Sequence, residues 1–163
     1  INRMKAGKPF LMFGSGTETA CKPISDDDLA TYLVGCIADE ARHDRVLPIG
    51  GPGPAITPLD QARALATLCD VPLRTRRIPL SLVRGISSML SGLGRVVPPF
   101  ADTAELARIA AYYAQESMLV WDDKSGRYDA EATPEFGTTT LFDHYASVVA
   151  GDGHYERVTT ELF

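Results

Sequence analysis

The densest group of reactive side chains in the sequence is the segment YYAQES, residues 112–117. At helical spacing, Tyr112 shares a face with Arg108 and Glu116, which lie four residues before and after it. A phenol close to a cation can donate a proton, so Tyr112 and its neighbour Tyr113 are candidate acid catalysts. Aromatic packing explains the two tyrosines equally well, and both interpretations stay open.

A second candidate is the basic group Arg74, Arg76 and Arg77, which precedes a long apolar stretch at residues 80–100. Guanidinium groups bind carboxylates in a bidentate geometry. The combination suits a ligand that carries carboxylates on a flat hydrophobic body. An exposed basic edge of the protein is an equally good interpretation.

Two glycine turns invite comparison with phosphate-binding loops. Residues 51–56, GPGPAI, place Ile56 where a dinucleotide fingerprint has its third glycine, and the two prolines have no N–H to donate. The turn at residues 14–16, GSG, is not followed directly by a helix. We therefore predict plain turns at both places, and no cofactor-binding residue is identified in this chain.

No metal site is predicted. His43, His144 and His154 have no His, Cys or carboxylate partner at ligand spacing. The aspartates around Gly126 lack the oxygen spacing and the distal Glu of a calcium loop, and a solvated hairpin turn is the better interpretation.

The composition is typical of a soluble globular domain. The chain has 163 residues, 45% of them hydrophobic and 23% charged, with a net charge of -5. This charge gives no general attraction to nucleic acid. The apolar stretch is interrupted by charged residues and prolines, so no transmembrane helix is predicted. Three widely spaced cysteines favour a reducing compartment, and a chain that opens on Ile1 is expected to be processed or part of something longer.

The first half alternates between strand and helix signals. An apolar strand is predicted at Phe10–Phe13 and another at residues 46–49. A helix capped by Ser25 should run to about Glu40. Its core-facing side is predicted to consist of Leu29, Leu33, Cys36 and Ile37. A second helix should start at Thr57, with Pro58 and Asp60 in its first turn and Ala62, Leu65 and Ala66 among its buried residues.

The second half adds more helices and a hairpin. Helices are predicted over residues 80–93 and from Asp102 onward, the second with Ile109 and Tyr113 on its buried face. Residues 118–121 and 127–128 should pair around Gly126. A last helix should begin near Thr138, and residues 152–163 are expected to form a loose tail. Strands alternating with helices predict an α/β fold.

Five motifs, KAGKPFLMFGSG, CKPISDDDLA, VLPIGGPGPAITPLDQ, YYAQESMLVWD and TPEFGTTTLFDHY, occur in this order between residues 5 and 145. In order and spacing they resemble the C-terminal half of the divinyl chlorophyllide 8-vinyl reductases, which are atypical short-chain dehydrogenases. The resemblance covers residues 5–151. It implies a Rossmann-like fold with helices and a short hairpin. It also implies that NADPH reduces the 8-vinyl group of divinyl chlorophyllide or protochlorophyllide to ethyl.

The family's glycine fingerprint lies upstream of the matched part, so the resemblance implies that NADPH binds upstream of Ile1 and that residues 1–151 form the substrate-binding portion. We assign the pigment to residues 80–100 and its propionate to Arg74, Arg76 or Arg77. Polar contacts are assigned to Lys22, Tyr112, Tyr113 and Ser117, with Tyr112 or Tyr113 as the candidate proton donor. The expected location is the cytoplasm of a phototrophic bacterium or a chloroplast, with peripheral contact to the photosynthetic membrane.

Two other function classes remain open. One is a different atypical short-chain reductase, acting on an isoprenoid or a flavonoid. The other is a noncatalytic protein that senses NADPH or assists assembly. Pigment uptake separates the vinyl reductase from the first alternative, and turnover separates it from the second.

Overall fold

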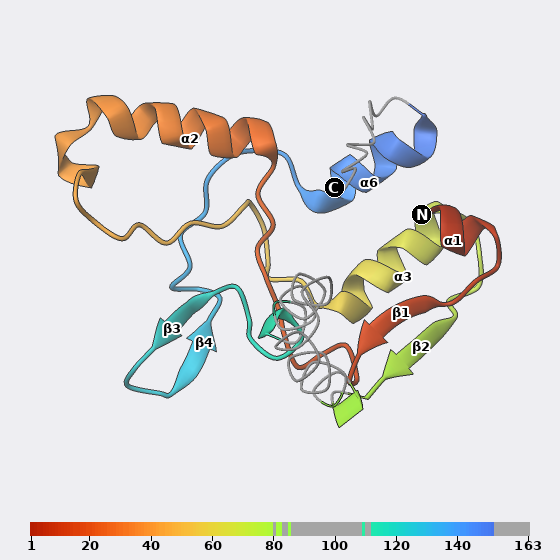
Figure 1. Ribbon diagram of the computed structural model, residues 1–163. Coiled ribbons are helices and arrows are strands. Elements are labelled where there is room, and N and C mark those ends of the chain that lie inside the picture. Colours follow the sequence, from red (N-terminus) through yellow and green to blue (C-terminus); the bar gives the residue numbers. More distant parts are fainter. Residues whose placement is uncertain (80, 83–84, 86–108, 110–111, 152–163) are drawn as a thin grey trace, which may run out of the picture.

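A computed structural model of the chain describes residues 1–79, 81–82, 85, 109 and 112–151 (Figure 1). The described helices are α1 (Asn2–Lys5), α2 (Asp26–Ala38), the short 3-10 helix η1 (Glu40–Arg42), α3 (Pro58–Leu68) and α6 (Leu141–Ala150). The strands are β1 (Phe10–Phe13), β2 (Thr75–Ile78), β3 (Val120–Asp122) and β4 (Arg127–Asp129). The helices expected over residues 80–93 and from Asp102, the apolar stretch at residues 80–100 and the tail at residues 152–163 lie largely or wholly outside the described residues.

Strands β1 and β2 pair in parallel, with Phe10 opposite Thr75 and Phe13 opposite Ile78. Parallel strands need a long crossover connection, and here it contains α2 and α3. Helix α3 packs against β1 (Figure 1). The chain is therefore a mixed α/β protein, as its alternating signals predicted. Strand β2 was not predicted, because two of its four residues are arginines and no apolar run marks it.

The centre of the described core lies between α1, α3 and β1. Met4, Leu65 and Ala66 are buried there, with Phe10 and Tyr145 packed against them. The predicted start of α3 is confirmed: the Thr57 hydroxyl accepts a hydrogen bond from the Asp60 N–H, and the Asp60 carboxylate accepts one from the Thr57 N–H. This reciprocal cap fixes the helix so that its small and apolar face meets β1.

Helix α6 is confirmed with a slightly later start than expected. Thr140 caps it, and Asp143 completes the same reciprocal pair of hydrogen bonds that begins α3. The helix ends at Gly151, whose φ of 91° lies in the left-handed region that glycine adopts without strain. Helix α6 packs against α3 and so closes one side of the core.

The prediction that α2 buries an apolar face is wrong. The helix begins at its Ser25 cap as expected, but none of its residues is buried, and Leu33 and Ile37 are 57% and 77% exposed. Figure 1 shows α2 standing apart from α3 and β1. Its periodic apolar residues fit a buried face, yet among the described elements its main packing partner is the short helix η1.

The strand predicted at residues 46–49 is also wrong. These residues form no ladder, and Val46 is 95% exposed. Only Gly50, just beyond them, forms an isolated bridge, with Glu135. An apolar run becomes a strand only where a neighbouring strand completes its backbone hydrogen bonds, and none of the described strands pairs with these residues.

The hairpin prediction is confirmed. Val120 pairs with Asp129 and Trp121 with Tyr128, and Gly126 in the turn has a φ of 63°. The strand starts two residues later than expected, because Met118 bridges to Cys21 instead.

The buried face predicted for the helix that should start at Asp102 is wrong at two of its positions, since Ile109 is 42% and Tyr113 is 54% exposed. No helix among the described residues is long and apolar enough to cross a membrane.

Candidate functional site

The predicted site residues Lys22 and Ser117 lie on neighbouring segments. Cys21 bridges to Ile56 on one side and to Met118 on the other. The Met118 N–H donates to the Ala20 carbonyl at 2.9 Å, and the Ala20 N–H donates to the Ser117 hydroxyl at 3.0 Å. These bonds join parts of the chain 97 residues apart and bring two of the predicted residues together.

The Lys22 ammonium is bound inside the protein. Its side chain is only 6% exposed, and Nζ lies 2.7 Å from the Glu135 carboxylate and 3.5 Å from the Thr133 carbonyl oxygen. The second Glu135 oxygen accepts the Gly53 N–H at 3.2 Å. The hydrogen bond from Lys22, followed by that from Gly53, lowers the pKa of Glu135. Lys22 therefore ties the loop at Gly53 to the loop at Glu135.

Thr133 is the one buried polar residue in the described part of the chain. Its hydroxyl accepts the Val120 N–H at 2.9 Å and donates to the Asp129 carbonyl at 2.7 Å. Because its own carbonyl receives Lys22, Thr133 links the hairpin to the Lys22–Glu135 pair. The sequence reasoning missed both Thr133 and Glu135, although the motif TPEFGTTTLFDHY contains them.

The Glu116 side chain does not pair with the Tyr112 side chain, although the helical spacing suggested that the two share a face. Its carboxylate instead accepts a hydrogen bond from the Tyr128 hydroxyl on β4. This bond, together with desolvation and the charge of Glu116, raises the pKa of Tyr128 to about 12, and Tyr112 adds a smaller contribution. Tyr128 thus holds its proton at neutral pH. The sequence offered no local signal for it, because β4 meets Glu116 only in the folded chain.

The two candidate acids, Tyr112 and Tyr113, are exposed. Their side chains are 61% and 54% exposed, and their rings meet edge to face with centroids 5.6 Å apart. Tyr112 influences Tyr128 electrostatically, so it lies near the Glu116–Tyr128 pair. The arrangement leaves both phenol rings open to a ligand, and it also shows the aromatic contact that the alternative interpretation expected.

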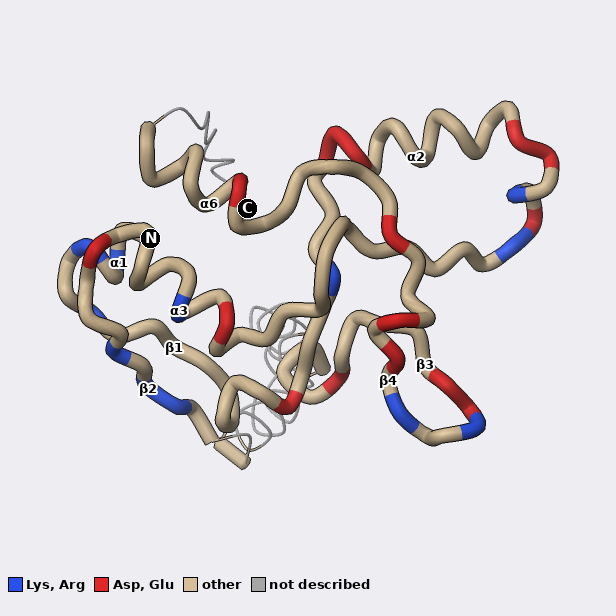
Figure 2. Tube along the Cα trace, turned by 180° about the vertical axis from the view of Figure 1, so that it is seen from behind, with Lys and Arg blue, Asp and Glu red and all other residues tan. Residues whose placement is uncertain are grey.

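The three arginines lie elsewhere. Arg76 and Arg77 are on β2, Arg74 just precedes it, and all three are exposed. Figures 1 and 2 show β2 at the opposite end of the described chain from β3 and β4. Among the described residues, no hydrogen bond or ion pair joins these side chains to Lys22 or Ser117. The structure therefore splits the predicted substrate contacts into two groups.

The described residues do not fit the phosphates of a dinucleotide. At the first glycine turn, the N–H groups of Ser15 and Gly16 donate to the Glu18 carboxylate at 2.9 and 3.2 Å. These bonds, led by that from the Ser15 backbone, lower the pKa of Glu18. At the second turn the Gly53 N–H already donates to Glu135. Internal carboxylates thus take the amides that a phosphate would need.

The helix N-termini are closed to anions in the same way. Asp28, Asp60 and Asp143 stand in the first turns of α2, α3 and α6, and each accepts hydrogen bonds from its capping residue or nearby N–H groups. The hydrogen bond from the capping hydroxyl is in each case the main reason why the pKa of the aspartate is lowered. A phosphate at any of these ends would meet a carboxylate charge.

Comparison with known proteins finds plant enzymes that match most of the chain. Divinyl chlorophyllide a 8-vinyl-reductase, chloroplastic, from Oryza sativa subsp. indica is 42% identical over 149 residues, which are 91% of this chain and 37% of that enzyme. The chain is homologous to this reductase. The protein of the same name from Arabidopsis thaliana is 40% identical over 149 residues, 91% of this chain and 36% of its own length.

The resemblance that the five motifs indicate is thereby confirmed over nearly the whole chain. The chain spans little more than a third of the length of the curated relatives that it matches. No protein-family model matches it.

Proposed function

We propose that the chain serves in the reduction of the 8-vinyl group of divinyl chlorophyllide or protochlorophyllide to ethyl, as the part of a reductase that it matches. The observation that carries the proposal is the 42% identity to the rice 8-vinyl-reductase over 91% of the chain. We further propose that the unit formed by β1, α3 and β2 belongs to the Rossmann-like fold that this relationship implies.

NADPH is the reductant that the proposal implies, and it would supply hydride. The glycine turns and helix N-termini described above do not fit its phosphates, so we assign the cofactor to the part of such enzymes that this chain does not match. The contribution proposed for this chain is to bind the pigment and to deliver a proton.

For the proton we propose Tyr112 or Tyr113. Their phenols are exposed, whereas the Tyr128 hydroxyl donates to Glu116, which raises the pKa of Tyr128 to about 12. A group that keeps its proton so firmly is a poor general acid at neutral pH. Tyr128 and Glu116 would instead fix the position of the segment that contains the two exposed tyrosines.

We propose that Lys22 and Ser117 act on the pigment indirectly: they fix two loops, and these loops contact the polar edge of the pigment. Lys22 fixes the loop at Glu135, and Ser117 fixes the backbone at Ala20. A flat ligand gains from such fixed loops because less conformational entropy is lost when it binds.

The first test is pigment uptake by the 163-residue chain. Mixing with divinyl protochlorophyllide should shift the absorption spectrum of the pigment, and an isoprenoid or a flavonoid should not compete. An unchanged spectrum would contradict the proposal. The same chain should show no NADPH binding, and micromolar affinity for NADPH would contradict the assignment of the cofactor to another part of the enzyme.

The second test measures turnover in a chimera in which this chain replaces the matching segment of the rice reductase. An active chimera supports the proposal. Tyr112→Phe or Tyr113→Phe should then lower the rate by about 100-fold or more, which is the typical contribution of a general acid. Tyr128→Phe, which loses only the bond that fixes this segment, should lower the rate less than loss of the general acid does. If both single variants at Tyr112 and Tyr113 keep full activity, the two phenols are structural.

A further inference from the structure

Two segments of the sequence contain no acidic residue, and the structure pairs them in one sheet. Neither residues 1–17 nor residues 71–101 include an Asp or a Glu, although the whole chain has a net charge of -5. Strand β1 belongs to the first segment and β2 to the second, and the two strands pair in parallel. The fold therefore gathers basic residues at one end of an otherwise acidic protein.

The residues gathered there form what we call the basic surface. All of its members are exposed: Arg3, Lys5, Lys8, Arg74, Arg76 and Arg77. Figure 2 shows their blue segments along α1, the turn after it and β2. Within the described residues none of the six belongs to an ion pair, whereas the acidic partners of Lys22, Arg42 and Arg63 neutralise those three side chains elsewhere.

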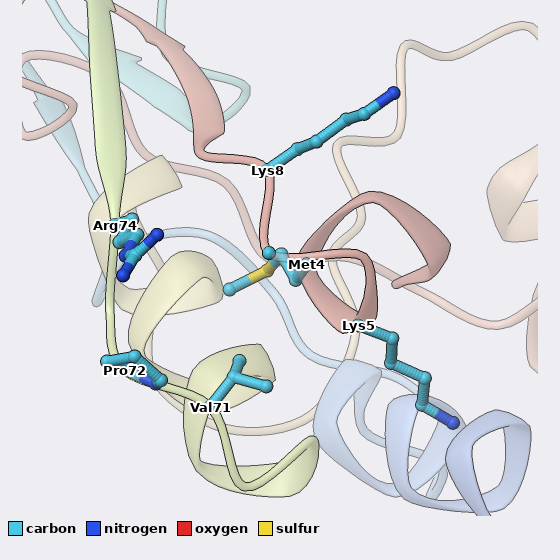
Figure 3. A pocket seen from close by; sticks show the side chains of 7 residues that line it. Met4, Lys5, Lys8, Val71, Pro72 and Arg74 are labelled. Carbon is cyan, nitrogen blue, oxygen red and sulfur yellow. The ribbon is translucent and has the colours of Figure 1, made fainter.

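The two halves of the basic surface meet around a hollow of about 190 Å³. Lys5, Lys8 and Arg74 line it together with the apolar side chains of Met4 and Val71. In Figure 3 the Lys5 and Lys8 side chains extend away from Met4 in different directions, so their charges spread outward instead of converging on one point. This arrangement suits an extended anionic surface better than a single small anion.

Exposed aliphatic side chains lie in the same segments as these charges. Leu11 is 44% exposed, Leu73 43% and Leu82 53%. Asp70, two residues after the end of α3, is the acidic residue that precedes the second acid-free segment. Basic residues mixed with exposed leucines favour an anionic lipid bilayer over nucleic acid, since nucleic-acid phosphates are contacted chiefly by polar groups. The acidic remainder of the chain would be repelled by the same bilayer and would orient the molecule.

We propose that the basic surface docks on the headgroups of an anionic lipid bilayer. This inference does not depend on the reductase function, because it rests only on charge, exposure and the pairing of β1 with β2. Each Lys or Arg close to an anionic membrane is worth about fivefold in affinity. Removing three of them should weaken binding by roughly a hundredfold.

The test is sedimentation of the chain with vesicles. It should bind vesicles of equal parts phosphatidylcholine and phosphatidylglycerol but not vesicles of phosphatidylcholine alone. Raising the salt from about 0.15 M to about 1 M, which shortens the screening length from ~8 Å to ~3 Å, should release it. Equal binding to both vesicle types, or no binding to either, overturns the proposal.

The decisive comparison uses two triple variants that lose the same number of positive charges. Arg74→Gln, Arg76→Gln and Arg77→Gln together should lower vesicle affinity by roughly a hundredfold. Arg45→Gln, Lys124→Gln and Arg127→Gln, all at exposed positions away from β2, should change it little. Equal losses in both variants would mean that only net charge matters, and would overturn the proposal.

Two further measurements separate membrane docking from misfolding and from nucleic-acid binding. If the first triple variant fails to fold, the variant Lys5→Gln with Lys8→Gln replaces it, with an expected loss of roughly 25-fold. If the chain binds duplex DNA at least as tightly as the anionic vesicles at the same salt, the surface is a nucleic-acid site and the proposal is wrong.

Discussion

Replacing Thr133 by valine should loosen the hairpin and the loop that holds Lys22. Valine has nearly the same shape but can neither accept the Val120 N–H nor donate to the Asp129 carbonyl, the two bonds that the hydroxyl makes at 2.9 and 2.7 Å. Each net hydrogen bond is worth about 1 kcal/mol, so the free energy of unfolding should fall by about 2 kcal/mol. For a chain of this size that lowers Tm by about 4–8 °C.

The matched control is Thr133→Ser, which keeps the hydroxyl and removes only the γ-methyl group. That methyl lies beside Gly50, and its loss should cost less than about 1 kcal/mol. Urea unfolding can be followed by the fluorescence of Trp121, the sole tryptophan of the sequence, which lies on β3. Amide exchange at Val120 should also be faster in the valine variant.

Two results would refute this role of the Thr133 hydroxyl. One is a valine variant that unfolds at the wild-type urea concentration. The other is a serine variant that is less stable than the valine variant, because methyl packing and not the hydroxyl would then hold the loop. In either case Thr133 would not be the link between the hairpin and the Lys22–Glu135 pair.

Single contacts elsewhere in the chain lead to three more expected outcomes. A Cβ atom at Gly51 would lie 1.8 Å from the Pro23 carbonyl oxygen, so Gly51→Ala should prevent soluble expression. At Gly35, inside α2, the nearest atom would be 3.8 Å away, so Gly35→Ala should raise the free energy of unfolding by up to about 1 kcal/mol. Glu116 raises the pKa of Tyr128 from 10.0 to about 12, so the stability from this bond should be present below pH 10 and lost as the pH rises to about 12; an ultraviolet titration of Tyr128→Phe should lose one late-ionising tyrosine. The Thr57 cap lowers the pKa of Asp60, so its stabilisation should be present above the ordinary value of 3.8 and lost as the pH falls through the lowered one; Thr57→Val should flatten this acid limb in a plot of Tm against pH, and an unchanged limb would show that the cap contributes nothing.

The parts of the fold that could be predicted well from the sequence are those set by neighbouring residues. Ser25, Thr57 and Thr140 cap their helices through bonds to residues three positions later. The hairpin likewise follows from a polar turn that contains Gly126. Such features need no knowledge of the rest of the chain, because both partners lie within one turn of backbone.

The features that could not be predicted depend on distant partners. Residues 46–49 and α2 have the apolar patterns of buried elements, but burial needs a surface to pack against. Strand β2 shows the opposite case: its arginines hide a strand that exists because β1 pairs with it. Strand β2 can keep its arginines because these side chains are exposed to water, and charges on an edge strand also hinder pairing with another chain.

The candidate site divides in the same way. Lys22 and Ser117 were named from motifs, but their bonding partners, Glu135 and Ala20, lie outside the reach of local patterns. The bond from Tyr128 likewise decides which partner Glu116 has. No spacing rule reaches from Lys22 to Glu135, which is 113 residues distant. Residue type could suggest candidates, and only the fold could show which of them is already bound.

A polar group that already donates or accepts inside the protein must break that bond before it can serve a ligand. A buried partner left behind then costs free energy. Lys22 stands in this position, since Glu135 and the Thr133 carbonyl oxygen hold its ammonium. Tyr112, Tyr113 and the basic surface can meet a ligand without breaking an ion pair among the described residues. Substitutions there should therefore change binding before they change folding, whereas substitutions at Lys22 should change both together.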